Sequence, residues 1–119
     1  MLAAEPGRGD EVVGVVNPGE AREAAATSNS FEVAIIGGGP AGLNAALILG
    51  RCRRRVVLFD AGEPRNAPSR GLHGFLSRDG VNPLKLRELG RAELERYPSV
   101  TWREGEIMRA ARETGGFRL

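Results

Sequence analysis

The sequence predicts an α/β fold, with an incomplete parallel sheet followed by the start of a β-meander. Three observations predict it. An apolar run at 33–36 leads directly into the glycine-rich sequence 37–42, and a second apolar run at 56–59 follows a segment of helical length. Strands that alternate with helices in this way form βαβ units with parallel strands. Near the C-terminus, Gly115-Gly116 separates two short strand-like segments, which is typical of a hairpin.

The central part of the chain should contain two strands with a helix between them. We expect the strands at 32–36 and 56–60 and the helix at 40–51. Pro40 suits a first helical turn, because its missing N–H would have no partner there. The residues at 43–49 are almost all apolar, as expected for a helix that is buried against a sheet.

A long connection and a second helix should follow. The segment 61–81 is rich in glycine and proline, and a loop of this length inside a compact domain tends to be functional. The second helix should begin with Asn82 as its N-cap and Pro83 in its first turn, and should end at Pro98. We expect further strands at 100–102, 107–111 and 117–119, with turns at Gly105 and Gly115-Gly116.

The N-terminal residues 1–29 are predicted to be a disordered leader. Their composition, rich in Ala, Gly and Glu, cannot bury enough apolar area to offset the entropy lost on ordering. A short strand within 11–16 is the one exception that we consider. The folded domain should then occupy residues 30–119, and its incomplete sheet should leave an exposed edge.

Charge and cysteine content argue against several classes of partner and site. The 17 Lys and Arg residues against 15 Asp and Glu residues give a net charge of +2, too small to indicate a nucleic-acid partner. The arginines at 51 and 53–55 fall where the first helix should end. We interpret them as a solvated helix terminus rather than a nucleic-acid patch, since no aromatic residues interleave with them. The single cysteine, Cys52, permits no internal disulfide, C-x-x-C pair or structural zinc site, so no metal is predicted.

No targeting or membrane segment is evident in the sequence. The chain has no apolar run of the length that a membrane span needs. Residues 1–29 carry several acidic side chains and lack a continuous apolar core, unlike a secretory signal or a transit peptide. The default expectation is therefore a cytoplasmic protein without a membrane partner.

The glycine-rich sequence has the G-x-G-x-x-G pattern of dinucleotide-binding sites. Gly37 would permit the tight turn, Gly39 would let a pyrophosphate approach the backbone, and Gly42 would let the helix pack closely on the sheet. The helix N-terminus would add N–H donors and a partial positive charge. Asp60, about 20 residues further on, would accept hydrogen bonds from both ribose hydroxyls and repel a 2′-phosphate. The alternative is that Asp60 only starts a turn.

The chain resembles the thioredoxin reductase-like flavoproteins, in particular the branch that includes dithiol oxidases of natural-product pathways and bacterial NAD(P)/FAD-dependent oxidoreductases. The resemblance covers 31–119 and is most specific at 62–66 (GEPRN) and 73–80 (HGFLSRDG). It implies a Rossmann-like FAD-binding unit, with 30–119 as the N-terminal part of an FAD/NAD(P)-binding domain.

The resemblance also implies a set of cofactor contacts. It places the FAD pyrophosphate at Gly37, Gly39, Pro40, Ala41 and Gly42, and the adenosine ribose at Asp60. It further implies that Arg65 and Asn66 run beside the cofactor, with His73 and Gly74 toward the flavin ring. A surface charge at Arg65, a loop-packing role for His73 and a plain turn at Asp79-Gly80 stay open as alternatives.

The implied activity is electron transfer between NADPH, flavin and a disulfide or dithiol substrate, or from a dithiol to O₂ in oxidase members. Family members are longer and are expected to be homodimers. They carry an NADPH-binding domain with a C-x-x-C pair, and neither that pair nor a second G-x-G-x-x-G occurs in this sequence.

We therefore interpret the chain as a truncated product, a fragment or one piece of a split enzyme, and no catalytic residue is assigned. Such a chain should be marginally stable or depend on a partner. The alternatives are a non-catalytic dinucleotide-binding module that acts with a partner chain, and a fragment of an NAD-dependent dehydrogenase.

Overall fold

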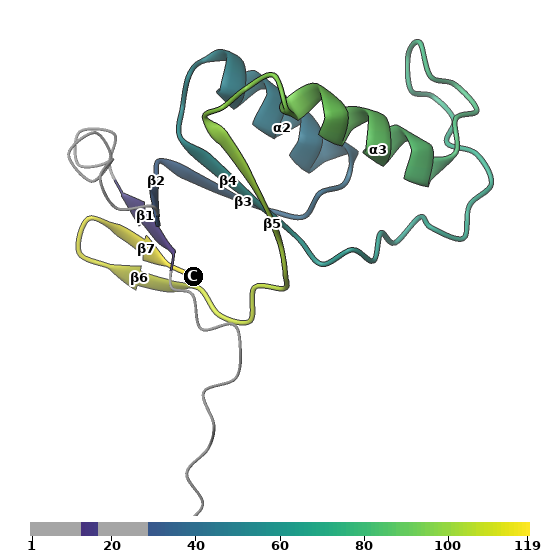
Figure 1. The fold of residues 1–119 in the computed structure, drawn as a ribbon. Helices are drawn as coiled ribbons and strands as arrows, with labels where there is room; N and C mark the ends of the chain where they lie inside the picture. The colour runs from purple at the N-terminus through teal and green to yellow at the C-terminus, as the bar shows by residue number, and fades with distance from the viewer. Residues whose placement is uncertain (1–12, 17–28) are drawn as a thin grey trace, which may run out of the picture.

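The structure is a computed structural model that describes residues 13–16 and 29–119. The predictions for 1–12 and 17–28 lie outside the described residues. The described residues form two helices and two sheets, and the main sheet lies between the helices and the smaller sheet (Figure 1).

The main sheet consists of three parallel strands. These are β3 (Val33–Ile36), β4 (Val56–Asp60) and β5 (Val100–Glu104), in the spatial order β3-β4-β5. All five residues of β4 are buried, as expected for a central strand that is covered on both faces. The predicted parallel βαβ unit is therefore confirmed. Within the described residues, β3 pairs on one side only, so the sheet has the open edge that the sequence predicted.

Both helices cover the same face of the main sheet (Figure 1). Helix α2 spans Pro40–Arg51, as predicted, and helix α3 spans Pro83–Leu94. Leu43 and Ala46 of α2 and Leu94 of α3 form a buried cluster with Leu58 of β4. This cluster fixes the helices over the strands whose ends will form the site.

Helix α3 begins as the sequence predicted but ends earlier. The Asn82 side chain accepts hydrogen bonds from the backbone N–H groups of Leu84 and Lys85 at 2.9 and 3.3 Å, so it is the N-cap. The predicted end at Pro98 is wrong. After Leu94 the chain continues in a tight turn, in which the Tyr97 N–H bonds the Leu94 carbonyl three residues back at 2.9 Å.

The second face of the main sheet is covered by the smaller sheet. Its strands are β1 (Gly14–Val16), β2 (Ser30–Phe31), β6 (Ala111–Glu113) and β7 (Gly116–Arg118), in the order β2-β1-β7-β6. Val13 and Phe31 are buried with Val57 and Phe59 of β4 in a second core cluster. The short strand expected within 11–16 is thus present as β1.

The strand predicted at 107–111 is wrong in position, because β6 begins only at Ala111. The segment before it is irregular, although Ile107 packs against the second core cluster. The predicted turn is also shifted by one residue. Gly116 pairs with Glu113 inside the β-ladder, so the turn consists of Thr114 and Gly115. Gly115 has a φ of +84°, a value that favours glycine, which explains the register.

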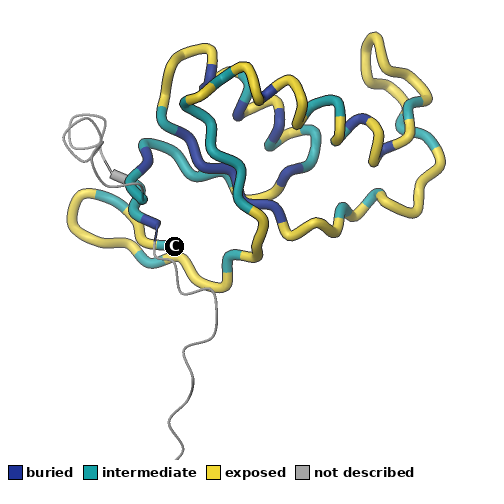
Figure 2. Tube along the Cα trace, viewed as in Figure 1, coloured by how far each residue is buried: buried dark blue, intermediate teal, exposed yellow. Residues whose placement is uncertain are grey.

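The connection between β4 and α3 is long, irregular and largely exposed (Figure 2). Its tip is held by backbone bonds: the Leu72 and Val81 backbones pair in an antiparallel bridge, and the Gly80 N–H bonds the Leu72 carbonyl at 2.8 Å. Among the described residues, none of the helices is long and apolar enough to cross a membrane.

Candidate functional site

The glycine loop, residues 37–39, connects the carboxyl end of β3 to α2. Gly37 has a φ of +107°, which favours glycine, and its N–H bonds the Phe59 carbonyl at 2.8 Å. A Cβ on Gly42 would lie 1.9 Å from the Gly37 carbonyl oxygen, so the turn and the helix can approach this closely only with glycine there. A Cβ on Gly39 would meet no atom within 4 Å. The loop is therefore tight on the sheet side and open at Gly39.

The start of helix α2 is suited to an anion. Its N-cap is Gly39, which has no side chain to cap the first turn, and the first turn has no acidic residue. Pro40 occupies the first helical position, as predicted. N–H groups that no side chain caps, at the positive end of the helix dipole, form a binding site for phosphate.

Asp60 lies beside the glycine loop, at the carboxyl end of β4. The residue is only 9% exposed. Its Oδ1 accepts a hydrogen bond from the Gly38 N–H at 3.2 Å, and its Oδ2 forms an ion pair with Nη2 of Arg87 on α3. The side chain thus connects the loop to the second helix, which is more than a turn-starting residue would do. Whether it also binds a ribose stays a prediction.

Trp102 lies against the glycine loop, and two arginines of α3 stack on its ring. A Cβ on Gly38 would lie 2.7 Å from Cη2 of Trp102 and 2.8 Å from Cγ of Asp60, so both side chains lie in close contact with the glycine loop. The guanidinium carbons of Arg87 and Arg91 lie 5.9 and 4.6 Å from the centroid of the Trp102 ring. Such stacking of arginine on tryptophan is favourable.

The sequence analysis missed Arg87 and Trp102. Arg87 is one of two arginines in its helix, and its partner Asp60 is remote in the sequence. No local pattern distinguishes it from a solvated charge.

The other predicted site residues lie on the long exposed connection. Arg65 is exposed and Asn66 is partly buried. His73 Nδ1 is 3.5 Å from Oδ1 of Asp79, and the same oxygen accepts a bond from the Gly74 N–H at 2.8 Å. Within the described residues, no hydrogen bond or ion pair joins Arg65, Asn66, His73 or Gly74 to the glycine loop. The structure therefore brings Asp60 to the loop, while the roles of these four residues stay predictions.

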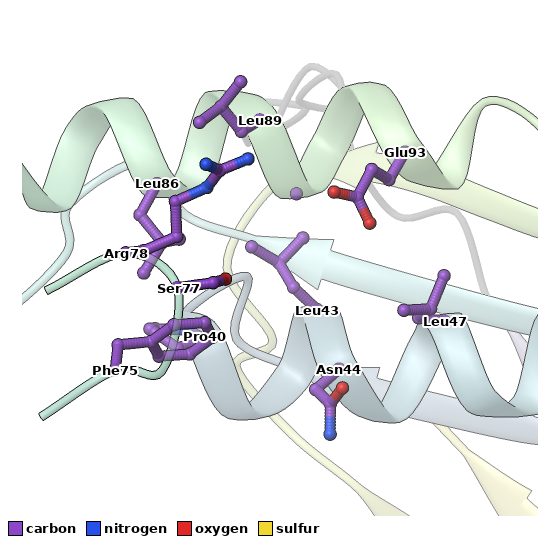
Figure 3. A pocket seen from close by; sticks show the side chains of 11 residues that line it. Pro40, Leu43, Asn44, Leu47, Phe75, Ser77, Arg78, Leu86, Leu89 and Glu93 are labelled. Carbon is purple, nitrogen blue, oxygen red and sulfur yellow. The ribbon is translucent and has the colours of Figure 1, made fainter. Parts of the chain in front are cut away.

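A cavity of about 270 Å³ lies between the two helices and the tip of the connection (Figure 3). Leu43, Leu47, Leu86 and Leu89 give it an apolar lining, and polar side chains stand around it. Of the predicted site residues only Pro40 lines it, so the cavity adjoins the start of α2 but is not the glycine loop itself.

Comparison with known proteins identifies the kind of site. Residues 32–81, which include the glycine loop and Asp60, match the family described as FAD binding domain. A thioredoxin reductase of Claviceps purpurea is 38% identical over 89 residues, covering 74% of this chain and 28% of that protein. A thioredoxin reductase of Aspergillus oryzae is 45% identical over 73 residues, covering 60% of this chain and 23% of that protein. The crystal structure of an oxidoreductase from Agrobacterium tumefaciens matches with a TM-score of 0.69 and 47% identity, over 73% of this chain and 30% of that one.

The chain is thioredoxin reductase-like. Its described residues have the fold of the FAD-binding portion of such flavoproteins, and FAD is the cofactor that this portion binds, so both sequence-based predictions are confirmed. The thioredoxin reductase-like chain spans about a quarter of the length of the curated relatives it matches, from 21% to 28%. The geometry fits the cofactor, since the open face of Gly39 and the uncapped start of α2 leave room and donors for a pyrophosphate.

Proposed function

We propose that this chain provides the FAD site of an oxidoreductase that passes electrons between NADPH, the flavin and a disulfide or dithiol substrate. The observation that supports this most directly is the FAD binding domain match at 32–81, which coincides with the glycine loop and Asp60. When bound, FAD would supply the electron carrier, because its ring can accept a hydride and release electrons singly or in pairs. In the proposed enzyme, the NADPH and substrate sites would belong to other segments than the FAD site.

The residues of this chain would bind and orient the cofactor. In this proposal the pyrophosphate lies over Gly39, against the first-turn N–H groups of α2, and the glycines at 37 and 42 keep the turn close to the sheet. Asp60 accepts hydrogen bonds from the ribose. Arg65 and Asn66 follow the cofactor along the connection, and His73 and Gly74 lie toward the flavin.

Several further predictions remain part of the proposal. These are a cytoplasmic location, a homodimeric assembly, and the absence of nucleic-acid and membrane partners. The alternative of a binding module that acts with a partner chain predicts FAD or NAD binding without turnover, even when the segments that would carry the NADPH and substrate sites are supplied. Turnover assays with those segments present therefore separate the two.

A titration of the purified chain with FAD tests the proposal. Because the glycine loop and Asp60 contact the adenosine half, FAD should bind and its fluorescence should change, whereas FMN, which lacks that half, should bind far more weakly. Equal binding of FAD and FMN would contradict the proposed placement. An absence of FAD binding would overturn the proposed function.

A further inference from the structure

We propose that Arg87 is a positioning residue for the adenosine end of the cofactor, acting through Asp60 rather than by touching the cofactor itself. The proposal rests on the proposed function, since it assumes that Asp60 binds the ribose. It adds a residue on α3 to a site that the glycine loop and β4 otherwise form.

The first argument is that Arg87 and the glycine loop hold the Asp60 carboxylate from two sides. Its Oδ1 accepts a hydrogen bond from the Gly38 N–H at 3.2 Å, and its Oδ2 forms an ion pair with Nη2 of Arg87. The side chains of Asp60 and Arg87 are only 11% and 21% exposed. An ion pair with so little exposure is sensitive to the loss of one partner, because the remaining charge is left buried without compensation.

The second argument concerns the number of acceptor sites. A carboxylate has about four lone-pair sites on its two oxygens. Gly38 uses one of these sites on Oδ1, whereas Oδ2 is a buried atom that is paired with the Arg87 charge. A ribose offers two hydroxyl donors on neighbouring carbons. By holding Oδ2, Arg87 therefore fixes Oδ1 beside the glycine loop, and Oδ1 keeps acceptor capacity for ribose hydroxyls.

The third argument is that Arg87 is itself held in place. Its guanidinium carbon lies 5.9 Å from the ring centroid of Trp102, and that ring in turn presses on Gly38. The contacts thus form a closed cycle. It runs from the glycine loop to Asp60, then to Arg87 and Trp102, and back to the loop. A planar guanidinium can pair with a carboxylate and stack on an indole at once, which lysine does less well.

The test compares Arg87→Gln with the matched control Arg91→Gln. Arg91 also stacks on Trp102, at 4.6 Å, but its ion pair is with Glu104 and not with Asp60. Each variant of the full chain is titrated with FAD, with ADP and with 2′,3′-dideoxy-ADP. We expect Arg87→Gln to weaken FAD and ADP binding roughly tenfold, the scale of coupling between contacting residues. Binding of the dideoxy nucleotide should change little, and Arg91→Gln should bind all three ligands like the unmodified chain.

A double-mutant cycle with Asp60→Asn decides whether Arg87 acts through Asp60. In the Asp60→Asn background, Arg87→Gln should cost little further FAD affinity. Arg87→Lys, which keeps the charge, should recover part of the loss and provides a second variant if Arg87→Gln does not fold.

Three results would overturn the inference while leaving the proposed function intact. These are an unchanged FAD affinity in both Arg87 variants, an equal loss for ADP and its dideoxy analogue, and full additivity with Asp60→Asn. Failure of the unmodified chain to bind FAD or ADP would instead remove the proposed function, and this inference with it.

Discussion

At the residue scale, the glycine motif carries two separate requirements that the structure distinguishes. Gly42 is needed for packing, because a Cβ there would lie 1.9 Å from the Gly37 carbonyl oxygen. Gly39 is not needed for packing, since a Cβ there would meet nothing within 4 Å, and its φ of −75° is accessible to any residue. The open space at Gly39 is where the proposed pyrophosphate would lie.

A pair of alanine substitutions should separate these requirements. Gly42→Ala should destabilise the fold by about 1–3 kcal/mol, because the added methyl group forces the loop and helix apart. Gly39→Ala should change the unfolding free energy by less than about 0.5 kcal/mol and still weaken FAD binding. Denaturant unfolding and FAD titration of both variants provide the measurement. A Gly39→Ala protein with unchanged FAD affinity would argue against a pyrophosphate at that position.

The sequence predicted the glycines and Asp60 because their spacing is a local signal. It did not predict Arg87 and Trp102, whose importance depends on α3 and β5 folding over the same strand end. Contacts of this kind depend on tertiary packing, and no periodic pattern in the sequence indicates them.

At the element scale, predictions succeeded where the chain carries an explicit start or stop signal. Helix α2 and strand β4 have the predicted bounds, and α3 begins at its Asn82-Pro83 signal. The errors lie where such a signal is weak. The end of α3 loosens into a turn before Pro98, and β6 starts at Ala111 because its pairing with β7 is set by the Thr114-Gly115 turn.

The cap of α3 can be tested by itself. Asn82→Ala should lower the free energy of unfolding by about 1 kcal/mol, because the N–H groups of Leu84 and Lys85 lose their acceptor. Asn82→Asp should be nearly neutral, since aspartate caps helices equally well. Thermal or urea unfolding followed by circular dichroism measures both. If the two variants unfold alike, the cap contributes nothing to stability.

At the scale of the whole molecule, the short N-terminal strand β1 helps to form the core that the two sheets share. Strand β1 pairs with β2 on one side and β7 on the other, and Val13, just before it, is 1% exposed between Phe31 and β4. Backbone bonds also link Val13 to Leu119 in both directions, at 3.3 and 3.0 Å. Neighbouring strands in this sheet lie far apart in the sequence. The sequence could therefore suggest strand β1 but not its position in the sheet.

Disruption of β1 should therefore loosen the smaller sheet selectively. Val13→Asp places a charge in the core, so the β6–β7 hairpin should lose protection from amide hydrogen exchange. The amides of β4 should lose less, because the helices cover the other face of that strand. Met108→Asp is a suitable control, since Met108 is 85% exposed. An equal loss of exchange protection in both sheets would contradict this prediction.

The open edge of β3 has a consequence for how a bound cofactor could be reached. In doubly wound sheets the next strand is added beside the first, and the ligand lies in the crevice between their carboxyl ends. Within the described residues only one wall of that crevice is present, formed by the glycine loop, Asp60 and α3. Any segment that takes a place along β3 would form the opposite wall. In the proposed enzyme, it would also decide which redox partner can come close to the flavin.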